Sequence, residues 1–144
     1  MKSLTISVFL LVSTTQLFSQ QLTKEAFLGS WKVVDSQLIS EIPLGLDTEG
    51  EKKMEQLRTG FIGTIFNFKA NNEFTIKFSD NIPEFMQELE FINNKKWKIE
   101  EGRMIAIGTE EDAYSLMGII VETKQGKTLF ILDETPFILE VTEQ

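Results

Sequence analysis

Alternating apolar and polar positions over the second half of the chain predict a series of β-strands. Residues 64–69 and 73–79 alternate in this way on either side of the turn-forming pair Asn71-Asn72, which is typical of a β-hairpin. Further strands are predicted by the same kind of pattern at residues 31–39, 96–100, 104–107, 114–123, 128–132 and 137–141. The chain is therefore expected to contain about eight strands joined mainly by short turns.

Three segments depart from the strand pattern. Residues 23–28 are predicted to form a short helical turn. Residues 47–59 have apolar side chains at helical spacing and acids near their start, which predicts a helix with Thr48 as its N-cap. Residues 83–91 fit either a short helix or an ordered loop.

Antiparallel strands joined by short turns form a meander, and a meander must protect its two edge strands. Closure into a barrel removes both edges. We therefore predict a mostly-β fold, an eight-stranded antiparallel up-and-down β-barrel with a short N-terminal helical turn and one helix between the first two strands. A β-sandwich is the alternative.

The first residues have the pattern of a secretory signal peptide. Lys2 is followed by an apolar run at residues 4–12, which is short for a membrane span, and by the small residue Ser19 near the expected cleavage point. We expect a signal peptide, residues 1–20, and one domain, residues 21–144, that is secreted or periplasmic. An N-terminal membrane anchor is the alternative. No cysteine follows the apolar run and no second apolar stretch occurs, so neither a lipoprotein nor a span in the mature chain is expected.

Length and charge narrow the classes of function. The 144 residues fit one domain, and a hydrophobic content of 42% is sufficient for a core. Asp and Glu number 22 against 14 Lys and Arg, which gives a formal charge of −8. An acidic domain repels phosphate backbones and anionic membrane surfaces, so no nucleic-acid partner is expected. The charge itself is explained by solubility.

The chain contains neither Cys nor His. Disulfides, thiol nucleophiles, Ser-His-Asp triads and His-based zinc sites are therefore excluded. The acidic residues 110–112 are expected to form a solvated loop, with a weak calcium site as the alternative. We predict that the chain is not an enzyme and needs no cofactor or metal, and acid–base catalysis by paired carboxylates is the weaker alternative.

The segment Gly29-Ser30-Trp31 resembles the Gly-x-Trp opening of lipocalins and lipocalin-like domains, and the order of predicted elements is similar over residues 22–141. The best likeness is to short, secreted bacterial lipocalin-like domains. The resemblance implies that Trp31 plugs the closed end of the barrel and that the barrel binds small apolar molecules. A basic residue that packs over this Trp in the family has no counterpart, because residues 137–144 contain neither Arg nor Lys.

The candidate ligand-binding residues share the face of the predicted strands that points inward, and they are Phe66, Phe68, Phe74, Ile76, Phe78, Trp97 and Ile99. They form either a fully packed interior or a pocket lined by aromatic rings, because a barrel of eight strands permits both outcomes. Arg58, near the end of the predicted helix, is placed either to meet a ligand carboxylate or simply to stabilise the helix C-terminus.

These observations favour a secreted lipocalin-like protein that binds or carries a small apolar ligand and does not catalyse a reaction. The alternative function is a filled β-barrel that acts as a protein-interaction or envelope-associated structural module. The volume left inside the barrel distinguishes the two.

Overall fold

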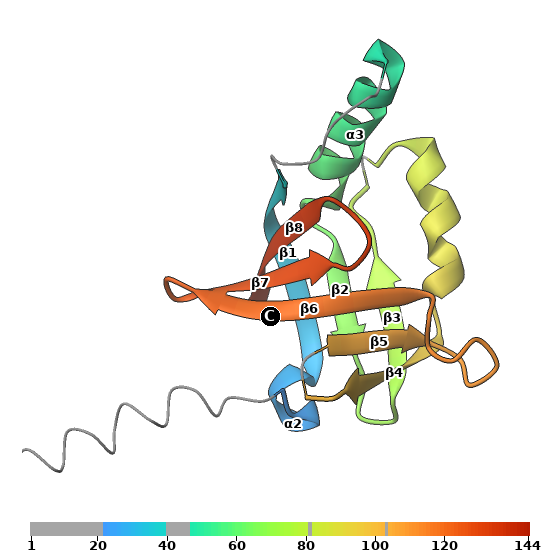
Figure 1. Cartoon of the computed structure of the whole chain (residues 1–144), viewed down its shortest axis with the longest axis vertical. Coiled ribbons are helices and arrows are strands. Elements are labelled where there is room, and N and C mark those ends of the chain that lie inside the picture. Colours follow the sequence, from blue (N-terminus) through green and yellow to red (C-terminus); the bar gives the residue numbers. More distant parts are fainter. Residues whose placement is uncertain (1–21, 40–46, 81, 103) are drawn as a thin grey trace, which may run out of the picture.

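Eight antiparallel strands form one closed barrel (Figure 1), in a computed structural model that describes residues 22–39, 47–80, 82–102 and 104–144. Each strand pairs with the next along the chain, and β1 (Gly29–Leu38) also pairs with β8 (Phe137–Glu143). The strands between them are β2 (Ile65–Phe68), β3 (Glu73–Lys77), β4 (Lys95–Glu100), β5 (Met104–Gly108), β6 (Met117–Lys124) and β7 (Lys127–Leu132). The predicted up-and-down barrel is confirmed, and the sandwich is excluded because β1 and β8 close the sheet.

Within the described ranges, three helical segments accompany the barrel: α2 (Lys24–Phe27), α3 (Thr48–Phe61) and the 3₁₀ helix η3 (Glu84–Ile92). The predicted N-cap of α3 is wrong by one residue. Asp47 has an extended backbone, and its carboxylate accepts a 2.8 Å hydrogen bond from the N–H of Gly50. The acid therefore caps the helix, as Asp commonly does, and Thr48 is the first helical residue.

The inward face of β1 changes in the middle of the strand. The alternation seen at the start of the strand places Trp31, Val33 and Asp35 on one face, but the register between β1 and β8 shifts between Val33 and Asp35. Such a bulge adds one residue to a strand and reverses the alternation after it. Val34 is accordingly 42% exposed, while Ser36 points inward and is buried. Asp35 therefore lies on the outer face of the barrel, although strict alternation from Trp31 and Val33 would place it on the inner face.

Residues 22–28 close one end of the barrel, the lower end in Figure 1. The N–H of Leu22 donates to the carbonyl of Gly102 at 2.9 Å, and Lys24 Nζ donates to the carbonyl of Ala70 at 2.8 Å. These bonds fix the segment to the β4–β5 and β2–β3 turns. Phe27 is buried, and its ring centroid lies 5.7 Å from that of Trp31.

Aromatic rings fill the interior next to this closed end. The ring of Phe130 lies 5.9 Å from Trp31, 5.7 Å from Phe66 and 6.2 Å from Phe68 between centroids. Phe68 also contacts Phe74 and Trp97, at 5.3 and 5.2 Å. Rings at these separations and tilts attract each other beyond the effect of burial alone. This half of the barrel is therefore a packed core.

The opposite end is less tightly closed, because β3 and β4 pair only through Glu73 with Lys96 and Phe74 with Lys95. Beyond those pairs, the segment that follows η3 lies against β3. Asn93 Oδ1 accepts a 2.6 Å hydrogen bond from the N–H of Ile76. A helical segment, η3, thus takes the place of part of the ladder between β3 and β4, and this leaves room at the end of the barrel.

Candidate functional site

A cavity of about 250 Å³ lies at the end of the barrel opposite α2. Its walls come from α3, from η3 and from the inner faces of β2, β3 and β7, together with residues near the starts of β6 and β8. All of its lining residues are apolar except Asp133 and Thr135. The predicted helix between the first two strands therefore does border a cavity, although a second helical segment, η3, contributes as much of the wall.

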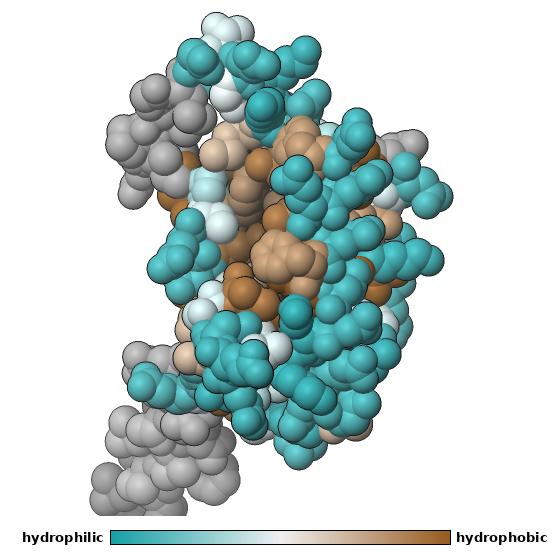
Figure 2. All heavy atoms as spheres, turned by 90° about the vertical axis from the view of Figure 1, so that its right-hand side faces the viewer, coloured by the Kyte–Doolittle hydropathy of each residue, from teal (hydrophilic) through white to brown (hydrophobic). Residues whose placement is uncertain are grey.

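The cavity opens to solvent through an apolar area of the surface. Figure 2 shows the side of the molecule that is on the right in Figure 1. Hydrophobic residues gather in the middle of this side around a hollow, and hydrophilic residues border them. Phe91, on η3, belongs to the lining and is 55% exposed. An exposed aromatic ring beside an apolar hollow is a common feature of binding surfaces.

The structure divides the predicted inward-facing residues into two sets. Phe66, Ile76 and Phe78 line the cavity. The other four do not: Phe68, Phe74 and Trp97 are packed in the filled half, and Ile99 is partly buried against the core. Strand alternation predicts which side chains point inward, but not at which depth of the barrel they lie. Both predicted alternatives, a packed interior and a pocket, thus apply, each to one half of the barrel.

Several lining residues were not predicted from the sequence. They come from the helical segments, Leu57 and Phe61 of α3 and Leu89 and Ile92 of η3. The apolar spacing of both segments was the available signal, since amphipathic helices bury their apolar stripe. That signal does not say whether such a stripe covers a packed core or a cavity.

Arg58 does not line the cavity. Its Nε donates to Glu55 Oε2 at 2.9 Å, its Nη2 donates to Glu55 Oε1, and its Nη1 donates to the carbonyl of Ser36 at 3.0 Å. The hydrogen bonds hold the pKa of the Glu55 carboxyl below its ordinary value and raise the pKa of Arg58. The guanidinium therefore attaches the last turn of α3 to β1, outside the lining of the cavity.

The contacts of Gly29 and Trp31, the two residues of the Gly-x-Trp motif, indicate roles in folding. Gly29 has a φ of +112°, a conformation that other residues rarely adopt, and a Cβ there would meet no atom within 4 Å. Backbone conformation, not space, is what requires glycine at this position. Trp31 is 8% exposed and donates its indole N–H to the carbonyl of Phe27 at 3.1 Å.

The polar groups of the lining come from the turn between β7 and β8. Thr135 Oγ1 donates to the carbonyl of Leu132 at 2.8 Å and accepts from the N–H of Phe137 at 3.2 Å, so its hydroxyl is already engaged. The backbone N–H of Asp133 donates to the carbonyl of Gly118 at 2.9 Å. Within the described residues, the carboxylate of Asp133 has neither a hydrogen bond nor an ion pair.

Acidic side chains elsewhere do not gather into a metal site, because the described ranges contain no group of three or more acids that could hold an ion. In the acidic loop at residues 110–112, Asp112 accepts hydrogen bonds from the N–H and the hydroxyl of Thr109, at 2.8 and 3.0 Å. The backbone bond from Thr109 lowers the pKa of the Asp112 carboxyl. This carboxylate thus stabilises its own turn.

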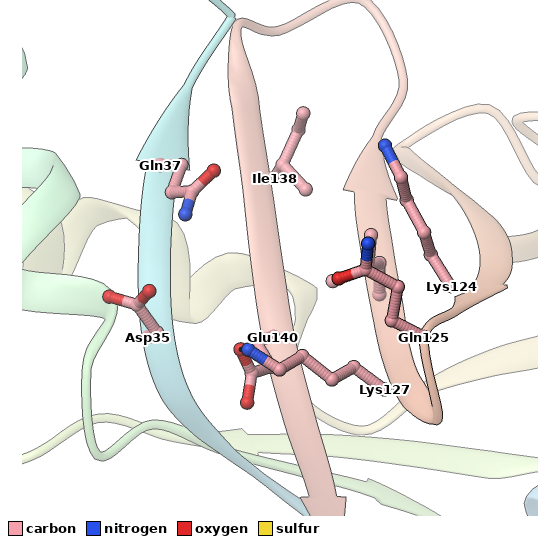
Figure 3. Close-up of a pocket in the computed structure, with 8 residues that line it drawn as sticks. Asp35, Gln37, Lys124, Gln125, Lys127, Ile138 and Glu140 are labelled. Atoms are coloured by element: carbon pink, nitrogen blue, oxygen red, sulfur yellow. Dashed lines mark ion pairs between the residues drawn. The ribbon is translucent and has the colours of Figure 1, made fainter.

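A second hollow, of about 260 Å³, lies on the outer face of β1, β7 and β8 (Figure 3). Its lining contains both acids and lysines, and Lys127 Nζ lies 3.4 Å from Glu140 Oε1. Asp35, displaced to the outside by the bulge, is also part of it. Exposed ion pairs of this kind contribute little energy, so the apolar cavity is the better candidate for a binding site.

No protein-family model matches the chain, and comparisons with curated proteins and with solved structures gave no match. The likeness of the segment Gly29 to Trp31 to lipocalins therefore stays a prediction, although the barrel that it implied is present. In the part of the chain that the structure describes, no helix has the length and apolar character needed to cross a membrane.

Proposed function

We propose that this chain is an exported, lipocalin-like barrel that binds or carries a small apolar molecule and performs no catalysis. The apolar cavity of about 250 Å³ between α3 and η3 carries this proposal. Binding sites for small molecules are concave and mostly apolar, with a few polar groups that orient the guest. The lining of this cavity, with Asp133 and Thr135 as its polar members, has that composition.

The volume sets the size of the guest. An apolar cavity of about 150 Å³ holds one benzene molecule, so by proportion 250 Å³ holds a guest of roughly ten non-hydrogen atoms. A micromolar dissociation constant corresponds to about −8 kcal/mol. Spread over ten atoms, that is roughly −0.8 kcal/mol per atom, which lies within the efficiency that small ligands reach. A medium-chain aliphatic molecule or a single aromatic ring with a short substituent fits these limits.

Export is part of the proposal and depends on the N-terminal sequence. Residues 1–20 carry the charged start, the apolar run and the small residue that signal peptides share. These positions lie outside the residues that the structure describes. A secreted or periplasmic carrier would meet its guest outside the cytoplasm. Because the chain has no cysteine, it has no thiol that such an oxidising compartment could convert to a disulfide.

A protein-interaction module is the second candidate, because Phe91 is 55% exposed at the edge of the apolar area. A partner would cover this ring and the cavity mouth together. The two candidates differ in one respect that can be measured, which is whether a small apolar molecule saturates the folded chain in the absence of any partner.

A matched pair of variants tests the carrier proposal. Phe78 lines the cavity, whereas Phe68 is fully buried among three other rings. Phe78→Trp fills part of the cavity, so we expect it to weaken binding of 1-octanol at least tenfold with a stability loss below about 1.5 kcal/mol. Phe68→Trp overpacks the core, so we expect a stability loss of about 1–3 kcal/mol and an affinity within about threefold of the native protein.

Titration calorimetry gives the affinities, and urea melts give the stabilities. Native protein that shows no saturable binding of 1-octanol would exclude the carrier function and leave the interaction module. Loss of binding in Phe68→Trp but not in Phe78→Trp would place the guest in the packed half of the barrel and would contradict the proposed site.

A further inference from the structure

Side chains along η3, drawn in yellow in Figure 1, repeat every three residues. Met86, Leu89 and Ile92 face the core: Met86 and Ile92 are buried, and Leu89 is partly buried against them. A second row of side chains is exposed, and it consists of Glu84, Gln87 and Glu90. A 3₁₀ helix has three residues per turn, so positions three apart lie on the same side. The inner side of η3 therefore forms part of the cavity wall, through Leu89 and Ile92.

Both ends of η3 are attached to neighbouring elements. Near its start, Gly60 of α3 packs so closely that a Cβ added there would overlap the sulfur of Met86. Directly after its end, Asn93 Oδ1 accepts the 2.6 Å hydrogen bond from the N–H of Ile76. The segment is therefore held by α3 at one end and by β3 at the other.

The part of η3 between these attachments has no polar anchor. Within the described ranges, no side chain of residues 84–92 makes a hydrogen bond or an ion pair, and Pro83 gives the helix no side-chain cap. The helix has nine residues, although 3₁₀ runs longer than three or four residues are uncommon because their hydrogen bonds have poorer geometry. A segment held mainly by apolar contacts opens locally at a lower cost in free energy than the whole domain. The middle of η3 can therefore move while the barrel stays folded.

Phe91 is the residue on which such a movement would act. Its side chain belongs to the cavity lining and is 55% exposed, whereas that of the adjacent Ile92 is 4% exposed. A guest in the cavity offers apolar surface against which this ring can be buried, and burial of apolar area is favourable.

We propose that η3 is a strap poised to close over the occupied cavity. Its two ends stay attached, its middle moves toward the guest, and the ring of Phe91 covers the mouth. The proposal rests on the proposed function, because closure requires a guest.

The size of the effect follows from the exposed area of Phe91. Burial of roughly half a Phe side chain corresponds to about a four- to twelvefold gain in affinity. Closure and guest binding stabilise each other, since the coupling between two equilibria is reciprocal. A guest therefore orders η3, and a strap that is already ordered binds the guest more tightly.

Phe91→Trp tests closure directly, because the protein's own indoles, Trp31 and Trp97, are only 8% and 2% exposed. We expect acrylamide to quench the fluorescence of the introduced indole in the free variant. Most of that quenching should be lost at saturating 1-octanol. Phe91→Ala, which removes the covering ring from an exposed position, should weaken binding of 1-octanol about four- to twelvefold, with the native stability in urea melts.

The attachment at Asn93 is tested by the affinity for 1-octanol. Asn93→Ala removes the acceptor for the N–H of Ile76, so the guest must order a looser strap, and we expect a two- to tenfold loss, the size of about one hydrogen bond. Asn93→Asp keeps an acceptor oxygen and should retain the native affinity. Asp112→Ala is the matched control, because it removes the acceptor for the N–H of Thr109 in a loop that does not line the cavity. We expect this control to leave the affinity unchanged.

The outcomes separate closure from the carrier function. Saturable binding of 1-octanol by Phe91→Trp with no loss of quenching overturns the strap and leaves the carrier function intact. An equal loss of affinity in Asn93→Ala and Asp112→Ala attributes that loss to general stability and also overturns the strap. If Asn93→Ala does not fold, the quenching of Phe91→Trp still decides the question. Failure of 1-octanol to bind the native protein removes the carrier function and the strap with it.

Discussion

Replacement of Trp31 by Ala tests whether the closed end of the barrel is the main source of its stability. The side chain is 8% exposed, and its ring lies 5.7 Å from Phe27 and 5.9 Å from Phe130 between centroids. Its indole N–H donates to the carbonyl of Phe27 at 3.1 Å. The residue thus joins the covering segment, residues 22–28, to the ring cluster inside.

Burial of a Trp side chain removes roughly 200 Å² from water, which at about 25 cal/mol per Å² contributes roughly 5 kcal/mol. Ala retains a small part of that area, and replacement of large aromatic core residues by Ala costs about 3–5 kcal/mol. We therefore expect Trp31→Ala to lower the free energy of unfolding by about 3–5 kcal/mol. Trp31→Phe keeps most of the area but loses the hydrogen bond, and we expect it to cost about 1–2 kcal/mol.

Urea melts followed by circular dichroism measure both losses, and they avoid the change in fluorescence that removal of an indole causes. A loss below about 1 kcal/mol for Trp31→Ala would refute the reasoning, because the ring could then not be part of a packed end. If the Ala variant does not fold, Trp31→Phe still decides the question. A Phe variant as stable as the native protein would contradict the contribution of the indole hydrogen bond.

Two further predictions concern the acidic loop and export. The lowered pKa of Asp112, below its ordinary 3.8, means that its stabilising effect is present above that value and is lost as the pH falls through the lowered pKa. Asp112→Asn should therefore be less stable than the native protein at neutral pH, and the difference should shrink as the pH falls below 3.8. A difference in urea melts that does not change with pH would contradict this. Intact-mass analysis of protein recovered from the envelope or the medium should show a chain that starts at Gln20 or Gln21, whereas a full-length species in the membrane would contradict cleavage.

Strand positions were predictable from the sequence because the side-chain period of a strand is local. The pairs Phe66 with Ile76 and Phe68 with Phe74 lie opposite each other in the predicted hairpin. The bulge at Val34 was not predictable, because the register between β1 and β8 depends on residues about 100 positions apart, as in the pair Ser36 with Leu139.

The site was predictable only in part. Alternation identifies Phe66, Ile76 and Phe78 as inward-facing, and the structure places all three in the cavity wall. The contribution of η3 to the cavity wall was not predictable. It depends on the fact that the β3–β4 ladder stops after two residue pairs, which no local pattern in the sequence encodes. Arg58 had a local signal that favoured a structural role, since an acid three residues earlier, Glu55, is on the same helix face.

The two halves of the barrel have opposite effects on stability, and this contrast supports a ligand-binding function. An unfilled cavity costs about 24 cal/mol per Å³, so 250 Å³ corresponds to at most about 6 kcal/mol, an upper limit because the mouth is open to solvent. A domain has a total stability of roughly 5–15 kcal/mol. The ring cluster around Phe130 offsets such a cost, since single rings of this kind contribute several kcal/mol each. A guest present at about 100 times its dissociation constant would add roughly 2.7 kcal/mol. A barrel with one tightly packed half can remain folded despite the cost of a cavity in the other half. This arrangement is expected of a protein whose cavity is occupied by a ligand.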